Sequence, residues 1–247
     1  MPRTLALGDH ELTRIGLGTN RLTDTPLNRA FIAAAVDAGV RMIDTAHVYT
    51  DGDSERTIGA ALADAPAEVV VATKGGYRPG TGNPDALRAQ LEQSFESLRT
   101  ETIALYYLHR VDPETPLEGS LGLLKEYCEA GRIEHVGLSA VGVDEIERGR
   151  AVLPIAAVQN PYNLADRRYD DVVDFCEAEG IVFLPYYPLH GPDATPNRVK
   201  LAWLLKRSPA TLPIPGTLSL EHLRENLSAL GLELSDADYE ELTGRSA

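Results

Sequence analysis

The sequence predicts an α/β protein, a closed (β/α)8 TIM barrel formed by a single domain over residues 1–247. Short apolar, β-branched runs alternate with helical patterns eight times, which is typical of parallel strands joined by crossover helices. A length of 247 residues suits one such barrel. The alternative, an open doubly wound sheet, needs a GxGxxG turn after its first strand, and "GLGTNRL" at 16–22 lacks that spacing.

The expected elements follow one another regularly after an additional N-terminal hairpin. Residues 3–13, "RTLALGDHELT", predict two short strands with a turn near Gly8 and Asp9, and we expect this hairpin to cap the barrel bottom. Asn83 and Pro84 are typical of a helix start. Strands are expected at 14–19, 41–46, 69–74, 103–109, 135–139, 155–160, 181–187 and 212–217, and helices at 28–38, 54–64, 84–98, 117–130, 143–150, 168–179, 196–207 and 219–229.

Composition limits the partners that this protein can have. The formal net charge is −14 and the pI is about 4.8, so the surface repels nucleic acid and anionic membranes. The N-terminus has no apolar signal-peptide region, and no apolar run reaches the length of a membrane span. We therefore expect a cytoplasmic monomer or weak homo-oligomer, with reduced thiols at Cys128 and Cys176.

Four polar side chains stand where consecutive strands are expected to end. Asp44 lies near the end of the second strand, Tyr49 follows in the next loop, Lys74 ends the third strand and His109 ends the fourth. In a (β/α)8 barrel all strands end at the same face, where the active site lies. A lone lysine or histidine at such a place is commonly structural, but four such residues at one rim favour catalysis.

This combination predicts a tyrosine that is tuned as a proton donor. A free phenol has a pKa of about 10, and a nearby ammonium lowers it by stabilising the phenolate. We therefore expect Lys74 to lower the pKa of Tyr49, with Asp44 as the counter-ion that compensates the buried lysine charge. A histidine beside the phenol, His109, can orient a carbonyl oxygen.

The same residues lie in motifs that resemble the aldo-keto reductase family over almost the whole chain. "GVRMIDTAHVY" followed by "SERTIGAAL" is similar to the family's second-strand signature, and "VVVATKGG" to its lysine motif. The run "YYLHRVDPETPLEGSLGLLKEYCEAGRIEHVGLSAV" resembles its histidine strand, the following helix and the fifth strand. "VQNPYN" and "IPGTLSLEHLRENLSAL" resemble its sixth strand and its C-terminal cofactor segment. The resemblance places the family's catalytic tetrad at Asp44, Tyr49, Lys74 and His109.

The resemblance also implies a nicotinamide cofactor bound without a Rossmann domain, and no metal. NADP(H) is the expected cofactor, with NAD(H) as the alternative. By analogy, Ser139 and Gln159 hold the carboxamide with Asn160 beside them, and Tyr186 stacks on the nicotinamide ring. Thr217, Glu225 and Asn226 hold the adenosine end. The cofactor-binding residues implied in this way are Gly18, Thr19, Asn20, Asp44, Ser139, Gln159, Tyr186, Pro188, Leu189, Gly216, Thr217, His222, Glu225 and Asn226.

Three positions depart from the family's pattern. Ala140 replaces an asparagine near the carboxamide site. Gly216 and His222 replace the lysine and the arginine that usually bind the adenine ribose phosphate. Since two fixed positive charges are missing, we expect only a modest preference for NADPH over NADH.

The sequence thus predicts reduction of a small-molecule aldehyde or ketone, with Tyr49 as the general acid. Two alternatives stay open. One is a catalytically silent barrel that binds the cofactor as a sensor or partner subunit, and the other is a lyase or isomerase that uses Lys74 as a Schiff base. Trp203 lies in a helical stripe that is more typical of a core. Candidate substrate-pocket residues are Tyr77, Tyr107, His47 and Trp203.

Overall fold

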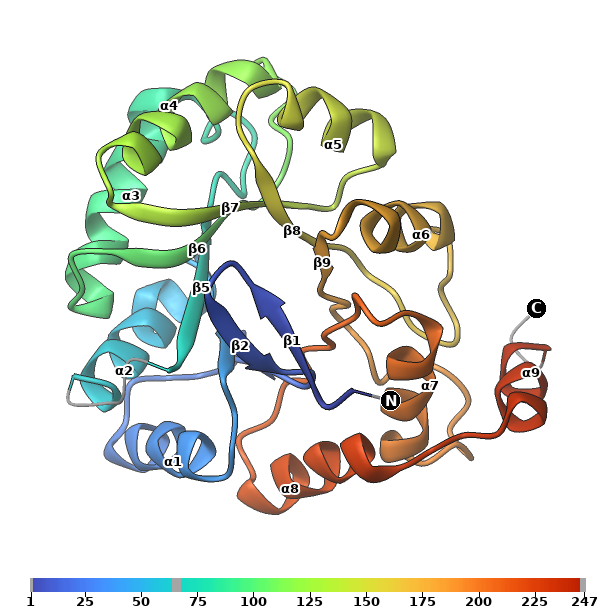
Figure 1. The fold of residues 1–247 in the computed structure, drawn as a ribbon. Helices are drawn as coiled ribbons and strands as arrows, with labels where there is room; N and C mark the ends of the chain where they lie inside the picture. The colour runs from blue at the N-terminus through green and yellow to red at the C-terminus, as the bar shows by residue number, and fades with distance from the viewer. Residues whose placement is uncertain (1, 64–67, 245–247) are drawn as a thin grey trace.

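A ring of parallel strands wrapped by helices forms the centre of the molecule, and Figure 1 shows it along the axis of the ring. The computed structural model describes residues 2–63 and 68–244. Seven strands form one sheet in which each pairs with the next along the chain. This sequential order confirms the predicted barrel and excludes a doubly wound sheet, whose order reverses. The seven strands are β3 (Leu17–Gly18), β4 (Met42–Asp44), β5 (Val70–Gly75), β6 (Ile103–Leu108), β7 (Ile133–Ser139), β8 (Ile155–Gln159) and β9 (Val182–Phe183).

The segment that closes the ring is extended but is not a regular strand, so the prediction of a strand over 212–217 is wrong in this respect. The carbonyls of Pro213 and Pro215 accept hydrogen bonds of 3.0 and 3.2 Å from the N–H groups of Gly16 and Gly18, next to β3. Neither proline has an N–H with which to return these bonds. The closing segment therefore makes isolated parallel bridges, Thr211 with Phe183 on one side and Gly216 with Gly18 on the other, in place of a continuous ladder.

Three strands are shorter than predicted by three residues or more. β3, β4 and β9 occupy only part of the runs expected at 14–19, 41–46 and 181–187. In the last of these runs Pro185 has no N–H to offer the sheet, and regular pairing ends at Phe183. The residues beyond the strands form the rim at which the site is built.

All eight predicted helices are present, with shifts of a few residues at their ends. The predicted helix 54–64 ends at Ala61, and residue 64 lies outside the described residues. Asn83 caps its helix as predicted, because its side chain accepts a hydrogen bond from the N–H of Ala86. The eight helices are α1 (Pro26–Asp37), α2 (Asp53–Ala61), α3 (Pro84–Leu98), α4 (Leu117–Glu129), α5 (Val143–Arg150), α6 (Asp170–Glu179), α7 (Asn197–Arg207) and α8 (Leu220–Ser228).

A further helix, α9 (Asp236–Gly244), is not among the predicted elements and lies against α7 outside the ring (Figure 1). The ring of Tyr239 stacks on that of Trp203 at 5.8 Å. The indole N–H of Trp203 donates to the hydroxyl of Thr243 at 2.9 Å. Trp203 is therefore fully buried in the core, as its helical stripe indicates, and is not a pocket residue.

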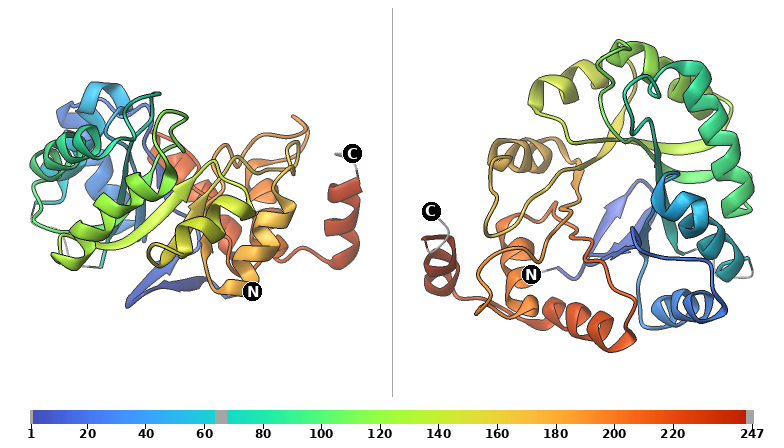
Figure 2. Two further views of the ribbon diagram at one scale, coloured as in Figure 1. Left: turned by 90° about the horizontal axis from the view of Figure 1, so that it is seen from above. Right: turned by 180° about the vertical axis from the view of Figure 1, so that it is seen from behind.

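The N-terminal hairpin of β1 (Thr4–Leu7) and β2 (His10–Thr13) covers one end of the ring, which is visible in both views of Figure 2. Leu7 and Leu12 are buried in one cluster with Met42 and Val70, the first residues of β4 and β5. The hairpin therefore caps the end at which the strands begin, as predicted, and leaves their other ends free for the site.

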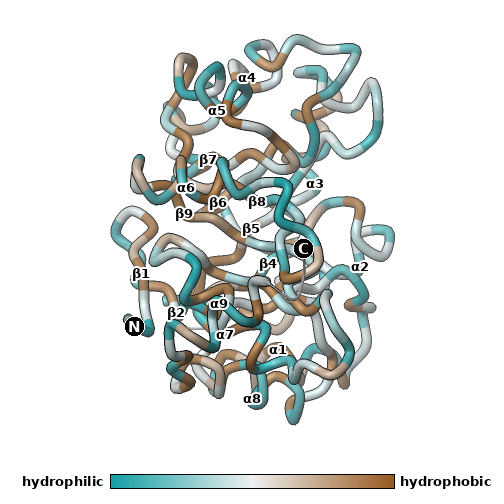
Figure 3. Tube along the Cα trace, turned by 90° about the vertical axis from the view of Figure 1, so that its right-hand side faces the viewer, coloured by the Kyte–Doolittle hydropathy of each residue, from teal (hydrophilic) through white to brown (hydrophobic). Residues whose placement is uncertain are grey.

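Two apolar clusters hold the barrel together. The inner cluster fills the ring, and the larger outer cluster packs the helices against the strands. Figure 3 shows the hydrophobic stretches gathered along the central strands and the hydrophilic ones along the outer helices and loops. The inner filling ends near the C-terminal ends of the strands, where buried polar residues such as Asp44 and Lys74 take over.

Candidate active site

A cavity of about 640 Å3 opens at the C-terminal ends of the strands. Loops after β3, β4, β5, β6 and β9 and the last residues of β7 and β8 contribute to its wall, so it lies where a (β/α)8 barrel places its active site. Three of the four predicted catalytic residues line it directly: Asp44, Tyr49 and His109. Lys74 is fully buried immediately beneath them.

The Lys74 ammonium is held by three acceptors, one for each of its N–H groups. Its Nζ lies 2.7 Å from Asp44 Oδ1, 2.7 Å from the carbonyl oxygen of Thr45 and 3.4 Å from the hydroxyl of Tyr49. The other carboxylate oxygen of Asp44 accepts a hydrogen bond of 2.7 Å from the amide of Gln159. With donors on both oxygens of Asp44, the arrangement is that of a buried ion pair.

The pKa shifts fit a charged lysine. Burial lowers the pKa of Lys74, but Asp44 and Tyr49 raise it by more, so it lies above its ordinary value. Burial raises the pKa of Asp44, and Lys74 and Gln159 offset part of that rise. Lys74 is therefore an ammonium at neutral pH and presents a fixed positive charge to the Tyr49 hydroxyl.

The pKa of Tyr49 corrects one expectation from the sequence. Burial raises this pKa above its ordinary value, and Lys74 lowers it by less than burial raises it. The prediction of a net lowering is wrong because desolvation of the phenolate outweighs the attraction of a single ammonium. Tyr49 thus keeps its proton at neutral pH, as a proton donor must.

A strained turn places Tyr49 at the cavity wall. Tyr49 begins a 3-10 turn, Tyr49–Gly52, in which Thr50, Asp51 and Gly52 have φ angles of 48°, 53° and 83°. A left-handed conformation is unfavourable for a β-branched residue such as Thr50. The Thr50 hydroxyl donates to the carbonyl of Leu22 at 2.6 Å, which ties the turn to the loop after β3.

His109 lies beside Tyr49 at the end of β6. Its ring is 6.0 Å from the Tyr49 ring in an edge-on arrangement and 4.7 Å from the ring of Tyr77. Its Nδ1 is buried and has no hydrogen-bond partner among the described residues. Burial lowers the pKa of His109 to about 2, and the charges of Lys74 and Arg110 act in the same sense. The imidazole is therefore neutral throughout the physiological range.

This shift predicts how stability depends on pH. Below about pH 6.5 the unfolded chain protonates His109 and the folded chain does not, so acid favours unfolding. We expect His109→Gln to reduce the slope of the unfolding free energy against pH by up to about 1.4 kcal/mol per pH unit between about pH 6 and 4. Urea denaturation at each pH measures it, and equal slopes for the two proteins would contradict a neutral His109.

Most of the predicted cofactor residues line the same cavity. Nine of them come from β3 and the loop after it, from the ends of β7 and β8, from the loop after β9 and from the closing segment, while Asp44 belongs to β4. Because Gln159 donates its amide N–H to Asp44, its carbonyl oxygen is left as an acceptor. The nine are Gly18, Thr19, Asn20, Ser139, Gln159, Tyr186, Pro188, Leu189 and Gly216.

The other predicted residues lie outside the cavity wall. Asn160 is buried, and its side chain bonds both backbone groups of Val141, so it holds the turn after β7. Thr217 accepts a hydrogen bond from the N–H of Ser219 ahead of α8. On α8 itself His222 and Glu225 are exposed and Asn226 is buried. Thr217 directly follows Gly216 of the cavity wall, and the three α8 residues come after it along the chain.

Seven lining residues are absent from the sequence-based set: Arg21, Val48, Arg110, Tyr187, His190, Ile214 and Pro215. A signal for Arg110 existed, since it directly follows His109 at the end of a strand. Of the candidate pocket residues, Tyr77 lines the cavity, Tyr107 is buried inside the ring and His47 lines a neighbouring cavity. Within the described ranges, no helix is both long and apolar enough to cross a membrane.

Fold and site together define a (β/α)8 barrel protein with a buried lysine–aspartate pair beneath a tyrosine and a histidine. A family model described as the aldo/keto reductase family matches residues 14–198 and 192–246, and the chain belongs to this family. The predicted resemblance is thereby confirmed.

Similar proteins include oxidoreductases that align over nearly their whole length. An uncharacterized oxidoreductase from Schizosaccharomyces pombe is 34% identical over 271 residues, which cover 97% of this chain and 88% of that protein. Pyridoxine 4-dehydrogenase from Escherichia coli is 31% identical, with 98% of both chains covered. A crystal structure of a thermostable aldo-keto reductase in complex with the inhibitor epalrestat superimposes with a TM-score of 0.90 at 29% identity, again over 98% of both chains. An aldo/keto reductase from Klebsiella pneumoniae in complex with NADP and acetate has a TM-score of 0.88 at 25% identity, over 100% and 96%.

Proposed function

We propose that this protein reduces aldehydes or ketones to alcohols with NADP(H) as the cofactor. One observation carries the proposal: a single ammonium, Lys74 Nζ, contacts both the Asp44 carboxylate and the Tyr49 hydroxyl at the base of the cavity. His109 lies at the same wall, with its ring next to that of Tyr49. A proton donor beside a neutral hydrogen-bonding group is what carbonyl reduction requires.

The residues present fit a nicotinamide cofactor. Ser139 and the free carbonyl oxygen of Gln159 match the hydrogen-bonding groups of a carboxamide, and the Tyr186 ring offers a face for stacking. Arg21, which lines the cavity and follows Asn20 in the sequence, supplies a cation for phosphate. When bound, NADPH supplies the hydride that reduces the carbonyl carbon. The similar aldo/keto reductase from Klebsiella pneumoniae is in complex with NADP, which supports the same choice.

Each residue of the site then has a defined task. Tyr49 donates its proton to the carbonyl oxygen as negative charge develops there. Lys74 stabilises the phenolate that remains, and Asp44 keeps the ammonium charged and in place. His109, being neutral, donates or accepts a hydrogen bond without adding a charge and so orients the carbonyl group.

The contacts of Lys74 also bear on the two alternatives. A Schiff-base lysine must be neutral to attack a carbonyl, whereas the contacts of Lys74 with Asp44 and Thr45 favour its charged form. A silent cofactor-binding barrel does not need a proton donor in contact with a buried cation. Carbonyl reduction is therefore the function that this geometry supports best.

An absorbance assay tests the proposal. Purified protein is mixed with NADPH and, in turn, with each aldehyde or ketone of a panel. The absorbance of the reduced nicotinamide is expected to fall only when a carbonyl compound is present. Binding of NADPH without turnover of any compound would favour the silent barrel. Trapping of Lys74 by borohydride in the presence of a carbonyl compound would favour the Schiff base.

Cofactor preference gives a second test. The His222 side chain is exposed in the first turn of α8, the helix that follows Gly216 of the cavity wall along the chain. We expect His222→Arg to increase the preference for NADPH over NADH by roughly tenfold, since one charge-assisted hydrogen bond contributes about 1.5–3 kcal/mol. Nicotinamide fluorescence titrations give both dissociation constants. His10→Arg, which adds the same charge at the barrel bottom, should change neither, and tighter binding of NADH by the unmodified protein would contradict NADP(H) as the cofactor.

A further inference from the structure

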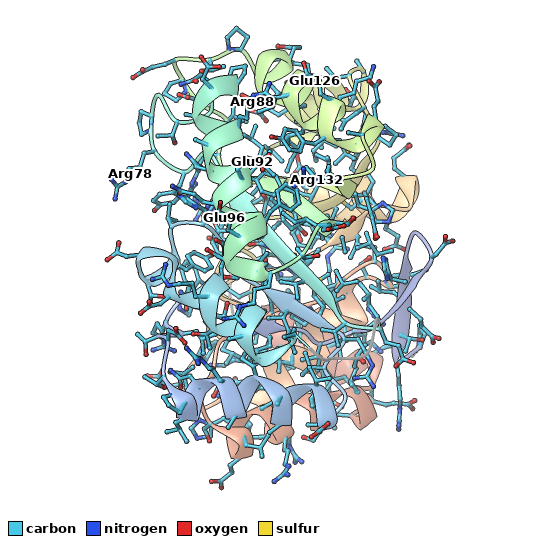
Figure 4. The ribbon with its side chains drawn as sticks, turned by 90° about the vertical axis from the view of Figure 1, so that its left-hand side faces the viewer. Arg78, Arg88, Glu92, Glu96, Glu126 and Arg132 are labelled. Atoms are coloured by element: carbon cyan, nitrogen blue, oxygen red, sulfur yellow. The ribbon has the colours of Figure 1, made fainter. Side chains whose placement is uncertain are left out.

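Arg110 is a cation at the cavity wall that has no task in the proposed proton transfer. Its side chain is exposed, and it forms no ion pair with any carboxylate among the described residues. Arginines on the outside of the barrel are different: Arg88 of α3 lies 3.4 Å from Glu126, and Arg132, just before β7, lies 3.8 Å from Glu92 (Figure 4). An unpaired guanidinium at a binding cavity is available for a ligand.

Its position on the ring places Arg110 with the reacting groups rather than with the cofactor residues. Arg110 follows β6, and Lys74 and Tyr77 come from β5 and the loop after it. The predicted nicotinamide residues come from β7, β8 and the loop after β9, and the predicted phosphate end lies near β3 and Gly216. In a closed ring the residues that follow β5 and β6 therefore lie on a different part of the rim from the predicted cofactor residues. We assign Arg110 to the part of the cavity in which the carbonyl compound binds.

An aromatic wall connects this cation to the candidate catalytic histidine. The guanidinium carbon of Arg110 lies 5.7 Å from the centre of the Tyr77 ring, and that ring lies 4.7 Å from the ring of His109. A ligand whose carbonyl group rests at His109 can therefore extend along Tyr77 and reach the guanidinium with its other end. A phenol ring suits a short apolar stem between two polar ends.

The charge of the whole protein makes such a local cation necessary for an anionic ligand. With a formal net charge of −14, the surface repels anions at long range. Asp44, the cavity's acidic residue, is paired with Lys74 and does not cancel the charge of Arg110. The positive groups at the cavity wall, Arg21 and Arg110, therefore decide whether an anion can bind there.

We propose that the preferred substrates are aldehydes or ketones that also carry a carboxylate, which Arg110 binds while Tyr77 packs against the stem. A planar guanidinium matches a carboxylate with two parallel hydrogen bonds. This inference rests on the proposed carbonyl reduction and adds to it the chemical class of the substrate and the residue that selects it.

Paired substrates separate the two proposals. We would compare kcat/KM for 4-oxobutanoate and for its methyl ester, which has the same aldehyde but no charge. The unmodified protein should prefer 4-oxobutanoate by about tenfold or more, the effect of one charge-assisted contact. Arg110→Gln should remove this preference by raising KM for 4-oxobutanoate about tenfold more than KM for the ester. Added salt should weaken the preference, because the guanidinium is exposed.

Arg78→Gln is the matched control. Arg78 is an exposed arginine of the same rim that lines the neighbouring cavity rather than this one, and its side chain points outward in Figure 4. Its loss should leave the preference intact. Equal turnover of both compounds by the unmodified protein, or turnover of neither while other carbonyl compounds are reduced, would overturn the inference and leave the proposed function standing, whereas turnover of no carbonyl compound at all would overturn both. A weaker affinity of Arg110→Gln for NADPH would assign Arg110 to the cofactor and also overturn the inference.

Discussion

Replacing Tyr49 with phenylalanine is expected to lower kcat for carbonyl reduction at least about a hundredfold, as for the loss of a general acid. The substitution removes one hydroxyl, which receives a 3.4 Å contact from Lys74, and leaves the ring and its packing against His109. The affinity for NADPH should change little, because the hydroxyl serves the substrate oxygen. Steady-state kinetics and nicotinamide fluorescence measure the two quantities on the same protein.

Tyr169→Phe provides the control, because it removes a phenol hydroxyl outside the cavity wall. It should keep the turnover of the unmodified protein. Circular dichroism shows whether both variants are folded. A stably folded Tyr49→Phe protein with near-normal turnover would contradict the assignment of Tyr49 as the acid.

Lys74→Met is expected to have a double effect, on turnover and on stability. Without the ammonium the phenolate of Tyr49 loses its stabilising charge, so kcat should fall by more than about a hundredfold. The variant also leaves the carboxylate of Asp44 buried without its counter-ion, which typically costs about 3–5 kcal/mol of unfolding free energy. Urea denaturation measures this loss, and Lys125→Met, at an exposed lysine of α4, should change it by less than about 0.5 kcal/mol.

Substitutions of Asp44 complete this test. Asn can still hydrogen-bond the ammonium, so Asp44→Asn should damage the fold less than Asp44→Leu. Because the two side chains are in contact, the double variant Asp44→Asn/Lys74→Met should lose less stability than the two single variants predict together. Full activity in both Asp44 variants would show that Asp44 is not the counter-ion of Lys74.

The sequence predicted the barrel because its signals are local and repeat along the chain. Eight apolar runs with helical stretches between them indicate parallel strands, and the structure confirms their order. The closing segment shows the limit of this reasoning. Its apolar run predicts a strand, but the absent N–H groups of Pro213 and Pro215 prevent a regular ladder. The missed helix α9 has a weak apolar pattern, and its contacts with Trp203 become visible only once α7 is in place.

The sequence by itself predicted that Asp44, Tyr49, Lys74 and His109 lie close together, because residues at the ends of parallel strands share one rim of a barrel. Only the tertiary structure determined in which direction the pKa values of these groups shift. The raised pKa of Tyr49 depends on how much water the surrounding loops exclude, and the lowered pKa of His109 on its burial near Lys74 and Arg110. The same holds for Arg110: whether an arginine after a strand lies free or paired depends on side chains from distant segments, which no local pattern of residues contains.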